Sequence, residues 1–145
     1  MPKKKIKTVA RLKKDLWTVF SRYIRLRDAI STTGMSTEVS CITCYRTYPT
    51  VEVDAGHFIA SYPHGYIRFD EKNVHAQCKR CNMNQGEQYL YGLRMIQLYG
   101  QEEVNRLQKE KNLEKKWRAS ELEALIVQYK AKVKEFIGAH GSPWA

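Results

Sequence analysis

The chain has 145 residues, a length typical of one domain, and its 43% hydrophobic content excludes a wholly disordered protein. No apolar run approaches the roughly 18 residues that a membrane span needs, which excludes an integral membrane protein. The formal net charge is +10, and residues 1–27 carry +9 of it, with ten cations and one acid. Such a basic arm is typical of proteins that bind polyanions, and we favour nucleic acid over anionic lipid or a merely solubilising tail.

The basic start of the chain is not followed by the apolar stretch of a secretory signal, so we expect a cytoplasmic protein. A membrane-surface protein could use the same lysines. That alternative is disfavoured because the arm has few apolar anchors.

The first half of the chain reads as a helix followed by short strands. Apolar residues recur at helical spacing over 13–28, with cations largely on the opposite face. A small, polar stretch at 31–38 predicts a linker. Short β-like segments are then expected at 51–54, at 56–59, and at 66–69 after a turn at 63–65.

The second half reads as helical. One helix is expected from Lys79 to residue 99, weakened by Gly86 and Gly92 and stopped by Gly100. A second stretch runs through Val104 and Leu107. The last helix is predicted to start at a capping box, Ser-Glu-Leu-Glu at 120–123, and to end at Gly138.

All four cysteines fall into two Cys-x2-Cys pairs, Cys41 with Cys44 and Cys78 with Cys81, with 33 residues between the pairs. Two such pairs can complete a tetrahedral Zn²⁺ site, and four thiolates leave no open position, so this zinc would be structural. Two disulfides are the alternative, but nothing indicates secretion. A redox motif would need a single pair in a βαβ context, which is absent.

The segment between the cysteine pairs contains His57, His64 and His75, and Asn82 follows Cys81 directly. A hairpin histidine can accept a proton from water, and an asparagine oxygen suits Mg²⁺. Each residue alone is weak evidence, since a hairpin histidine is usually a hydrogen-bonded surface residue and such an asparagine often only caps a helix.

The order Cys-x2-Cys, Gly-His, Asn-x-His, Cys-x2-Cys-Asn resembles the zinc-stapled branch of the HNH, or ββα-metal, nucleases. The runs at 68–78, 54–58 and 23–29 are similar, more closely, to the phage lambda NinG (Rap) family of recombination nucleases. The resemblance implies an α+β, mainly helical fold. A zinc-stapled HNH-like core at 35–99 would be flanked by a basic arm and helix at 1–34 and a helical region at 100–145.

The resemblance also implies roles for single residues. His57 takes the place of the general base, Asn73 that of the residue bracing the hairpin, and Asn82 that of a ligand to a catalytic Mg²⁺ or Mn²⁺. Many HNH enzymes place an Asp ligand directly before the histidine, where this chain has Gly56. The candidates for the missing ligand are Asn82 first, Asp54 second and His75 third.

The expected function is therefore metal-dependent cleavage of branched DNA, such as Holliday junctions and D-loops, leaving 5′-phosphate and 3′-hydroxyl ends. Two cuts in one junction need two active sites, so a homodimer joined through the terminal helices is expected. Phage or host recombination proteins are candidate partners, and no association with a membrane is expected. The rival is a non-catalytic zinc protein that binds DNA. Eight cations are expected to contact phosphates: Lys13, Lys14, Arg22, Arg25, Arg68, Lys72, Lys79 and Arg80.

Overall fold

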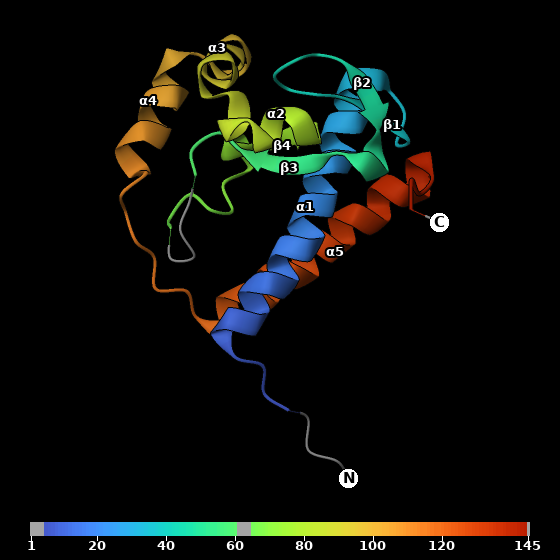
Figure 1. Cartoon of the computed structure of the whole chain (residues 1–145). Helices are drawn as coiled ribbons and strands as arrows, with labels where there is room; N and C mark the ends of the chain where they lie inside the picture. The colour runs from blue at the N-terminus through green and yellow to red at the C-terminus, as the bar shows by residue number, and fades with distance from the viewer. Residues whose placement is uncertain (1–4, 61–64, 145) are drawn as a thin grey trace.

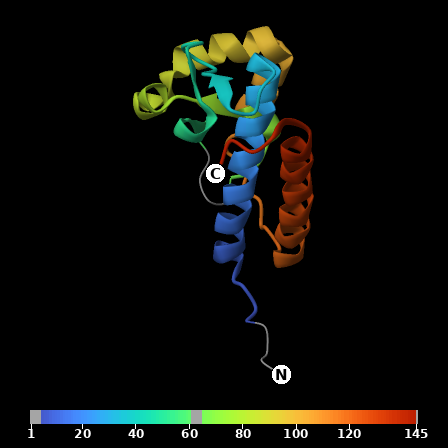
Figure 2. The same ribbon diagram turned by 90° about the vertical axis from the view of Figure 1, so that its right-hand side faces the viewer.

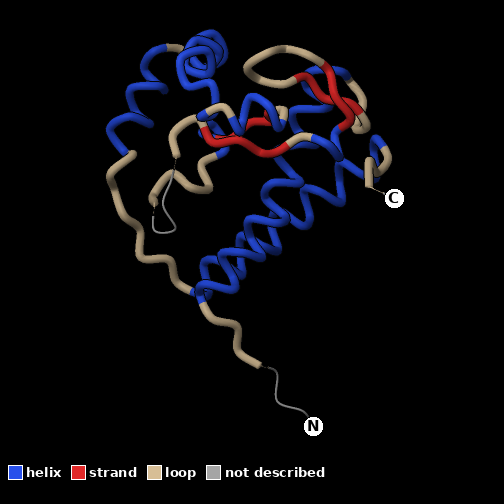
Figure 3. The backbone as a smooth tube through the Cα atoms, in the orientation of Figure 1, coloured by secondary structure: helices blue, strands red, loops and turns tan. Residues whose placement is uncertain are grey.

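The computed structural model describes residues 5–60 and 65–144 and is mainly helical, with two small antiparallel sheets (Figures 1 and 3). The helices are α1 Val9–Thr33, α2 Lys79–Met83, α3 Gln88–Tyr99, α4 Gln101–Glu110 and α5 Ala119–His140. The strands are β1 Glu38–Ser40, β2 Thr47–Pro49, β3 Asp54–His57 and β4 Val74–Gln77. Short 3₁₀ turns lie at η1 Thr50–Glu52, η2 Glu71–Asn73 and η3 Gln85–Glu87.

Helix α1 has 25 residues and extends at both ends beyond the helix predicted over residues 13–28. The side chain of Thr8 accepts a hydrogen bond from the Arg11 amide at its start, and Gly34, at a φ of 77°, ends it. The expected linker at 31–38 is thus partly helix and ends in β1. Positive φ favours glycine because other residues strain there.

Helices α1 and α5 run side by side in the same direction, as both views show (Figures 1 and 2). Their apolar faces form the largest core cluster, in which Phe20 contacts Tyr129 edge-on at 5.0 Å between ring centroids. Val74 of β4 belongs to the same cluster. The two terminal helices therefore bury their apolar faces against each other and against the central sheet.

The start of α5 corrects the predicted capping box. The helix begins at Ala119, with Arg118 as its N-cap, and Ser120 lies inside the first turn. The amide of Leu122 already donates to the Arg118 carbonyl, so the Ser120 hydroxyl has no capping position to fill. The helix also continues past Gly138 to His140 and ends at Gly141, whose φ is 82°.

The strand partner of β3 differs from the one expected from the sequence. Strand β3 pairs with β4, with Gly56 opposite His75 and His57 opposite Val74. Its partner is therefore not the segment at 66–69, which forms turns. Residues 51–52, expected in a strand, lie in a 3₁₀ turn before β3. Residues 63 and 64 of the predicted turn at 63–65 lie outside the described residues.

The outer edge of β4 is covered by side chains of α1. Arg27 donates to the carbonyls of Glu71 and Val74, each at 2.8 Å, and the Asp28 carboxylate accepts from the Ala76 amide at 2.7 Å. These bonds satisfy backbone groups that an edge strand otherwise exposes.

The single helix predicted over 79–99 is two helices with a break between them. Gly86 has a φ of 71°, and Gln85 and Glu87 on either side of it are also at positive φ. This break turns α3 away from α2 and leads it into α4, with which it closes a second apolar cluster around Tyr91, Met95 and Leu107. Among residues 5–60 and 65–144, no helix has the length and apolar character needed to cross a membrane.

Candidate functional site

The four cysteines meet where the turn after β1 contacts the start of α2. Their sulfur atoms all lie within 4.8 Å of one another, as the two Cys-x2-Cys pairs predicted. Cys41, Cys78 and Cys81 are buried and Cys44 is half-buried, and none forms a disulfide. The Ile42 amide donates to the Ala76 carbonyl at 3.0 Å, which brings the two pairs together across the 33 residues between them.

The donors in this cluster fit a zinc ion. Four thiolates at about 2.3 Å from a tetrahedral zinc stand roughly 3.8 Å apart, and the Cys44 and Cys78 sulfurs are 4.0 Å apart. The Cys78 amide also donates to the Cys41 sulfur at 3.3 Å. Burial opposes ionisation of Cys41, but backbone N–H groups outweigh it and lower the pKa of this thiol to about 7. The cluster could therefore bind a zinc ion and leave it no open position.

A second group of polar side chains lies beside the zinc cluster, on the face of β3 that meets α2. The Asn82 amide donates to the Asp54 carboxylate at 3.1 Å, and Lys79 forms an ion pair with the same carboxylate at 2.7 Å. A half-turn of an amide exchanges its oxygen and nitrogen, so this position also lets the Asn82 oxygen face a cation. The two residues ranked first and second as metal ligands thus lie together.

Gly56 lies on the same face of β3 and cannot carry a side chain without movement of its neighbours. A Cβ atom there would stand 2.3 Å from Gln77 Oε1 and 3.2 Å from Asn82 Oδ1. With Gln77 packed against Gly56, the position before His57 has no room for the carboxylate that many HNH enzymes carry there.

Gln77 is a site residue that the sequence reasoning missed. It is fully buried, and its amide nitrogen donates to the Gly86 carbonyl at 2.8 Å. Its Oε1 has no hydrogen-bond partner among the described residues. This buried oxygen lies next to Asn82, and Gln77 is the residue of β4 that pairs with Asp54 of β3. A buried oxygen without a partner in this place fits a set of oxygen ligands for a hard cation. The only sequence signal was its position directly before Cys78.

His57 is the last residue of β3 and points to the opposite face, because side chains alternate along a strand. Its ring stacks on Trp17 of α1 at 5.0 Å between centroids and 16° between planes. Its Nε2 lies 3.0 Å from the Arg68 carbonyl oxygen. A carbonyl can only accept, so Nε2 carries the proton and Nδ1 keeps its lone pair. Burial lowers the pKa of His57, which leaves the ring neutral at pH 7.

Asn73 is fully buried and ties down the chain that leaves β3. Its side-chain oxygen accepts from the Ile59 amide at 2.9 Å, and its nitrogen donates to the carbonyls of Ile59 and Ile67. These bonds give it the geometry of the bracing role that the resemblance implies.

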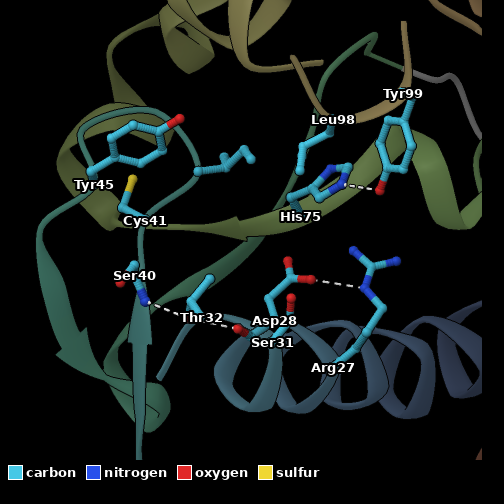
Figure 4. A pocket seen from close by; sticks show the side chains of 11 residues that line it. Arg27, Asp28, Ser31, Thr32, Ser40, Cys41, Tyr45, His75, Leu98 and Tyr99 are labelled. Carbon is cyan, nitrogen blue, oxygen red and sulfur yellow. Dashed lines mark hydrogen bonds and ion pairs between the residues drawn. The ribbon is translucent and has the colours of Figure 1, made fainter. Parts of the chain in front are cut away.

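His75, ranked third as a metal ligand, is occupied elsewhere (Figure 4). Its Nδ1 lies 3.1 Å from the Tyr91 hydroxyl and its Nε2 2.7 Å from the Tyr99 hydroxyl. Burial lowers the pKa of His75 to about 4. The residue contributes to the wall of a cavity of about 350 Å³ that Arg27 and Asp28 also line. The printed contacts join it to neither Asp54 nor Asn82, so we assign it to the core.

The eight cations expected to bind DNA do not share one surface. Arg68 lies close enough to act electrostatically on both Lys13 and His57, while Arg22 and Arg25 flank the Trp144 ring at 5.1 and 5.2 Å. The remaining four are distributed over separate parts of the surface. Lys72 pairs with Glu103 of α4, Lys79 with Asp54, and Lys14 and Arg80 are exposed.

Comparisons with known proteins place the chain in a family. The model of the family described as "Bacteriophage Lambda NinG protein" matches residues 1–137, and the chain belongs to this family. The proteins named "Protein ninG" from Escherichia phage 933W and Escherichia phage lambda are 30% and 29% identical to it over 139 residues. The alignments cover 92% of this chain and 64% and 63% of the two relatives.

The protein of the same name from Salmonella phage P22 is 27% identical, again over 92% of this chain and 64% of the relative. The chain thus spans somewhat less than two thirds of the length of these relatives. No solved structure matches the chain. The family resemblance noted from the sequence is confirmed, and the relationship to HNH nucleases stays a prediction.

Proposed function

We propose that this protein is a metal-dependent endonuclease that cuts branched DNA, with the active site built around β3. The observation that carries this proposal is the state of His57. It is a neutral imidazole held by the Arg68 carbonyl, and its Nδ1 has no hydrogen-bond partner among the described residues; Asp54, a proposed oxygen ligand, lies three residues earlier on the same strand.

His57 would take a proton from the attacking water at Nδ1. The Arg68 carbonyl fixes the tautomer, and the stacked Trp17 ring fixes the plane of the imidazole. The lowered pKa keeps this base unprotonated at neutral pH.

Asp54 and Asn82 would hold the catalytic Mg²⁺ or Mn²⁺, with Gln77 Oε1 as a third oxygen. Such an ion stabilises the charge that develops on the phosphate and on the leaving oxygen. The Lys79 ammonium now occupies one carboxylate oxygen of Asp54 and would have to give way to the ion. Asp54 begins β3 and His57 ends it on the opposite face, so the DNA strand would have to cross β3 between the metal ligands and the base.

Lys13 and Arg68 would position the scissile phosphate. Lys13 is only 6% exposed, and burial, with the nearby Arg68 charge, lowers its pKa. The same charge acts on His57. A phosphate between these cations would offset their mutual repulsion and lie within reach of the base.

The four cysteines would bind a structural zinc that fixes α2, and with it Asn82, against β3. We further propose a homodimer, since two cuts in one junction need two sites, with phage or host recombination proteins as partners.

The alternative is a non-catalytic zinc protein that binds DNA. Zinc and positive charge fit both functions equally, whereas a half-buried, neutral histidine on the strand that also carries Asp54 has no evident use in a binding module.

The test is cleavage of a labelled four-way junction and of a linear duplex of matched sequence, in Mg²⁺ and in EDTA. Wild-type protein should cut the junction only in Mg²⁺, and His57→Ala and His57→Gln should lose cutting by at least about 100-fold while still binding. His140→Ala, at an exposed site on α5, is the control and should cut normally. Binding without cutting in either Mg²⁺ or Mn²⁺ would favour the alternative.

A further inference from the structure

A second basic surface lies on the far side of α1 from His57. The groove between α1 and α5 has a volume of about 650 Å³ and an apolar floor that includes Val19 and Val133. Five cations line it, against the single carboxylate of Asp15. They are Lys7, Arg11, Arg22, Lys130 and Lys134.

Residues of α1 that face this groove are separate from those near the proposed active site. Arg11, Asp15 and Arg22 recur at i, i+4 and i+11, which places them within about 40° of one another around the helix at 100° per residue. Trp17, which stacks on His57, lies about 120° around the helix from Arg11 on the same count, and Lys13 about 160°. Lys13 and Trp17 therefore face away from the cations of the groove.

The groove keeps an excess of positive charge after its internal ion pairs are counted. Asp15 is bonded to Lys7 at 2.8 Å and to Arg11 at 3.2 Å, and these cations lower its pKa. One carboxylate is thus shared by two cations, while Arg22, Lys130 and Lys134 have no ion pair among the described residues within 4.0 Å. Arg22 lies over the Trp144 ring, which orients it without neutralising it.

We infer that the groove between α1 and α5 binds the phosphate backbone of a second DNA segment, separate from the segment at His57. This inference rests on the proposed function and refines it, because it gives a physical basis for preferring branched over linear DNA. A linear duplex that lies along one side of α1 cannot also follow the opposite side. Two arms of a junction can occupy both sides at once.

The two cations contributed by α5 were not among the DNA contacts predicted from the sequence. They lie in a region whose net charge is close to neutral overall, so composition gave no reason to single them out. Only the packing of α5 beside α1 brings Lys130 and Lys134 to the same groove as Arg11 and Arg22.

The test is the salt dependence of binding by Lys130→Glu/Lys134→Glu, measured by fluorescence anisotropy in EDTA. The probes are a synthetic four-way junction and a linear duplex with the same arm sequence. Loss of two phosphate contacts should lower the slope of log affinity against log salt by about 2 for the junction. The slope for the duplex should stay unchanged.

The matched control is Lys109→Glu/Lys111→Glu at the end of α4, where both lysines are exposed and the change of net charge is the same. It should leave both slopes as in the wild type. Thermal unfolding of both variants shows whether the fold is intact.

An equal loss for junction and duplex would overturn the inference, because the groove would then contact the same DNA segment as the active site. A result equal to the control would also overturn it. Since binding is measured without divalent metal, either result is independent of cleavage. A protein that never cuts DNA would refute the nuclease proposal and leave this measurement valid.

Discussion

Neighbouring residues of one short strand have separate tasks in this molecule. Gly56 leaves room for the buried oxygen of Gln77, while His57, the next residue, stacks on Trp17 on the opposite face of the strand. The sequence motif Gly-His singled out the proposed base, but the proposed role of Gln77 depends on a close approach that no spacing rule describes. The cysteines were predictable because metal binding requires a fixed number of ligands at short spacing.

His75 gives a prediction that depends on pH. Its pKa is about 4 in the folded protein and about 6.5 when unfolded, so the unfolded chain binds the proton first as pH falls. Stability from this residue is complete above pH 6.5 and is lost between pH 6.5 and 4, by about 3 kcal/mol. We expect urea unfolding at pH 7 to 4 to show this loss.

His75→Gln keeps a polar side chain but cannot titrate, so its free energy of unfolding should fall less steeply over the same pH range. His140→Gln is the exposed control and should follow the wild type. Parallel pH profiles for wild type and His75→Gln would contradict the assignment.

At the scale of elements, α2 depends on the cysteine cluster for its position. The helix has five residues, too few to be stable alone, and its N-cap is Cys78. Long, periodic helices such as α1 and α5 were predictable from their apolar stripes. The break at Gly86 and the pairing of β3 with β4 were not, because both are decided by tertiary contacts rather than by local pattern.

If the cysteine cluster binds a structural zinc ion, as proposed, removal of that ion should unfold the centre of the protein. Cys78→Ser should lose one equivalent of zinc and lower the midpoint of thermal unfolding, because zinc binding supplies folding free energy. Hydrogen exchange should show the loss of protection over β1, β2 and α2.

Ser40→Ala, next to the cluster and without a ligand sulfur, is the control for this experiment. A Cys78→Ser protein that has lost its metal but unfolds at the wild-type temperature would show that the cluster is not a structural zinc site.

For the whole molecule, a dimer joined through the terminal helices stays a prediction. The apolar faces of α1 and α5 pack mainly against each other within one chain, so we propose a different surface for the contact between two chains. The outer face of α3 exposes Tyr89, Leu93 and Ile96 at helical spacing, and Arg94 is the single charged residue of this helix. In a chain of charge +10, a nearly uncharged surface is where two copies repel least.

We expect light scattering to find two chains per four-way junction. Leu93→Glu should reduce this to one, because it puts a charge into an apolar contact. Val127→Glu on the outer face of α5, where Val127 is 68% exposed, should leave two chains. A wild-type protein that stays monomeric on the junction would refute the dimer.

The side chains of Arg27 and Asp28 that cover β4 have a consequence for engineering a smaller protein. A fragment that began at residue 35 would keep all four cysteines, His57 and Asn82, yet it would leave the amide of Ala76 and the carbonyl of Val74 without their partners. Uncovered strand edges of this kind pair with one another between molecules. The smallest unit that stays in solution as separate molecules should therefore include α1, although none of the proposed metal ligands lies on that helix.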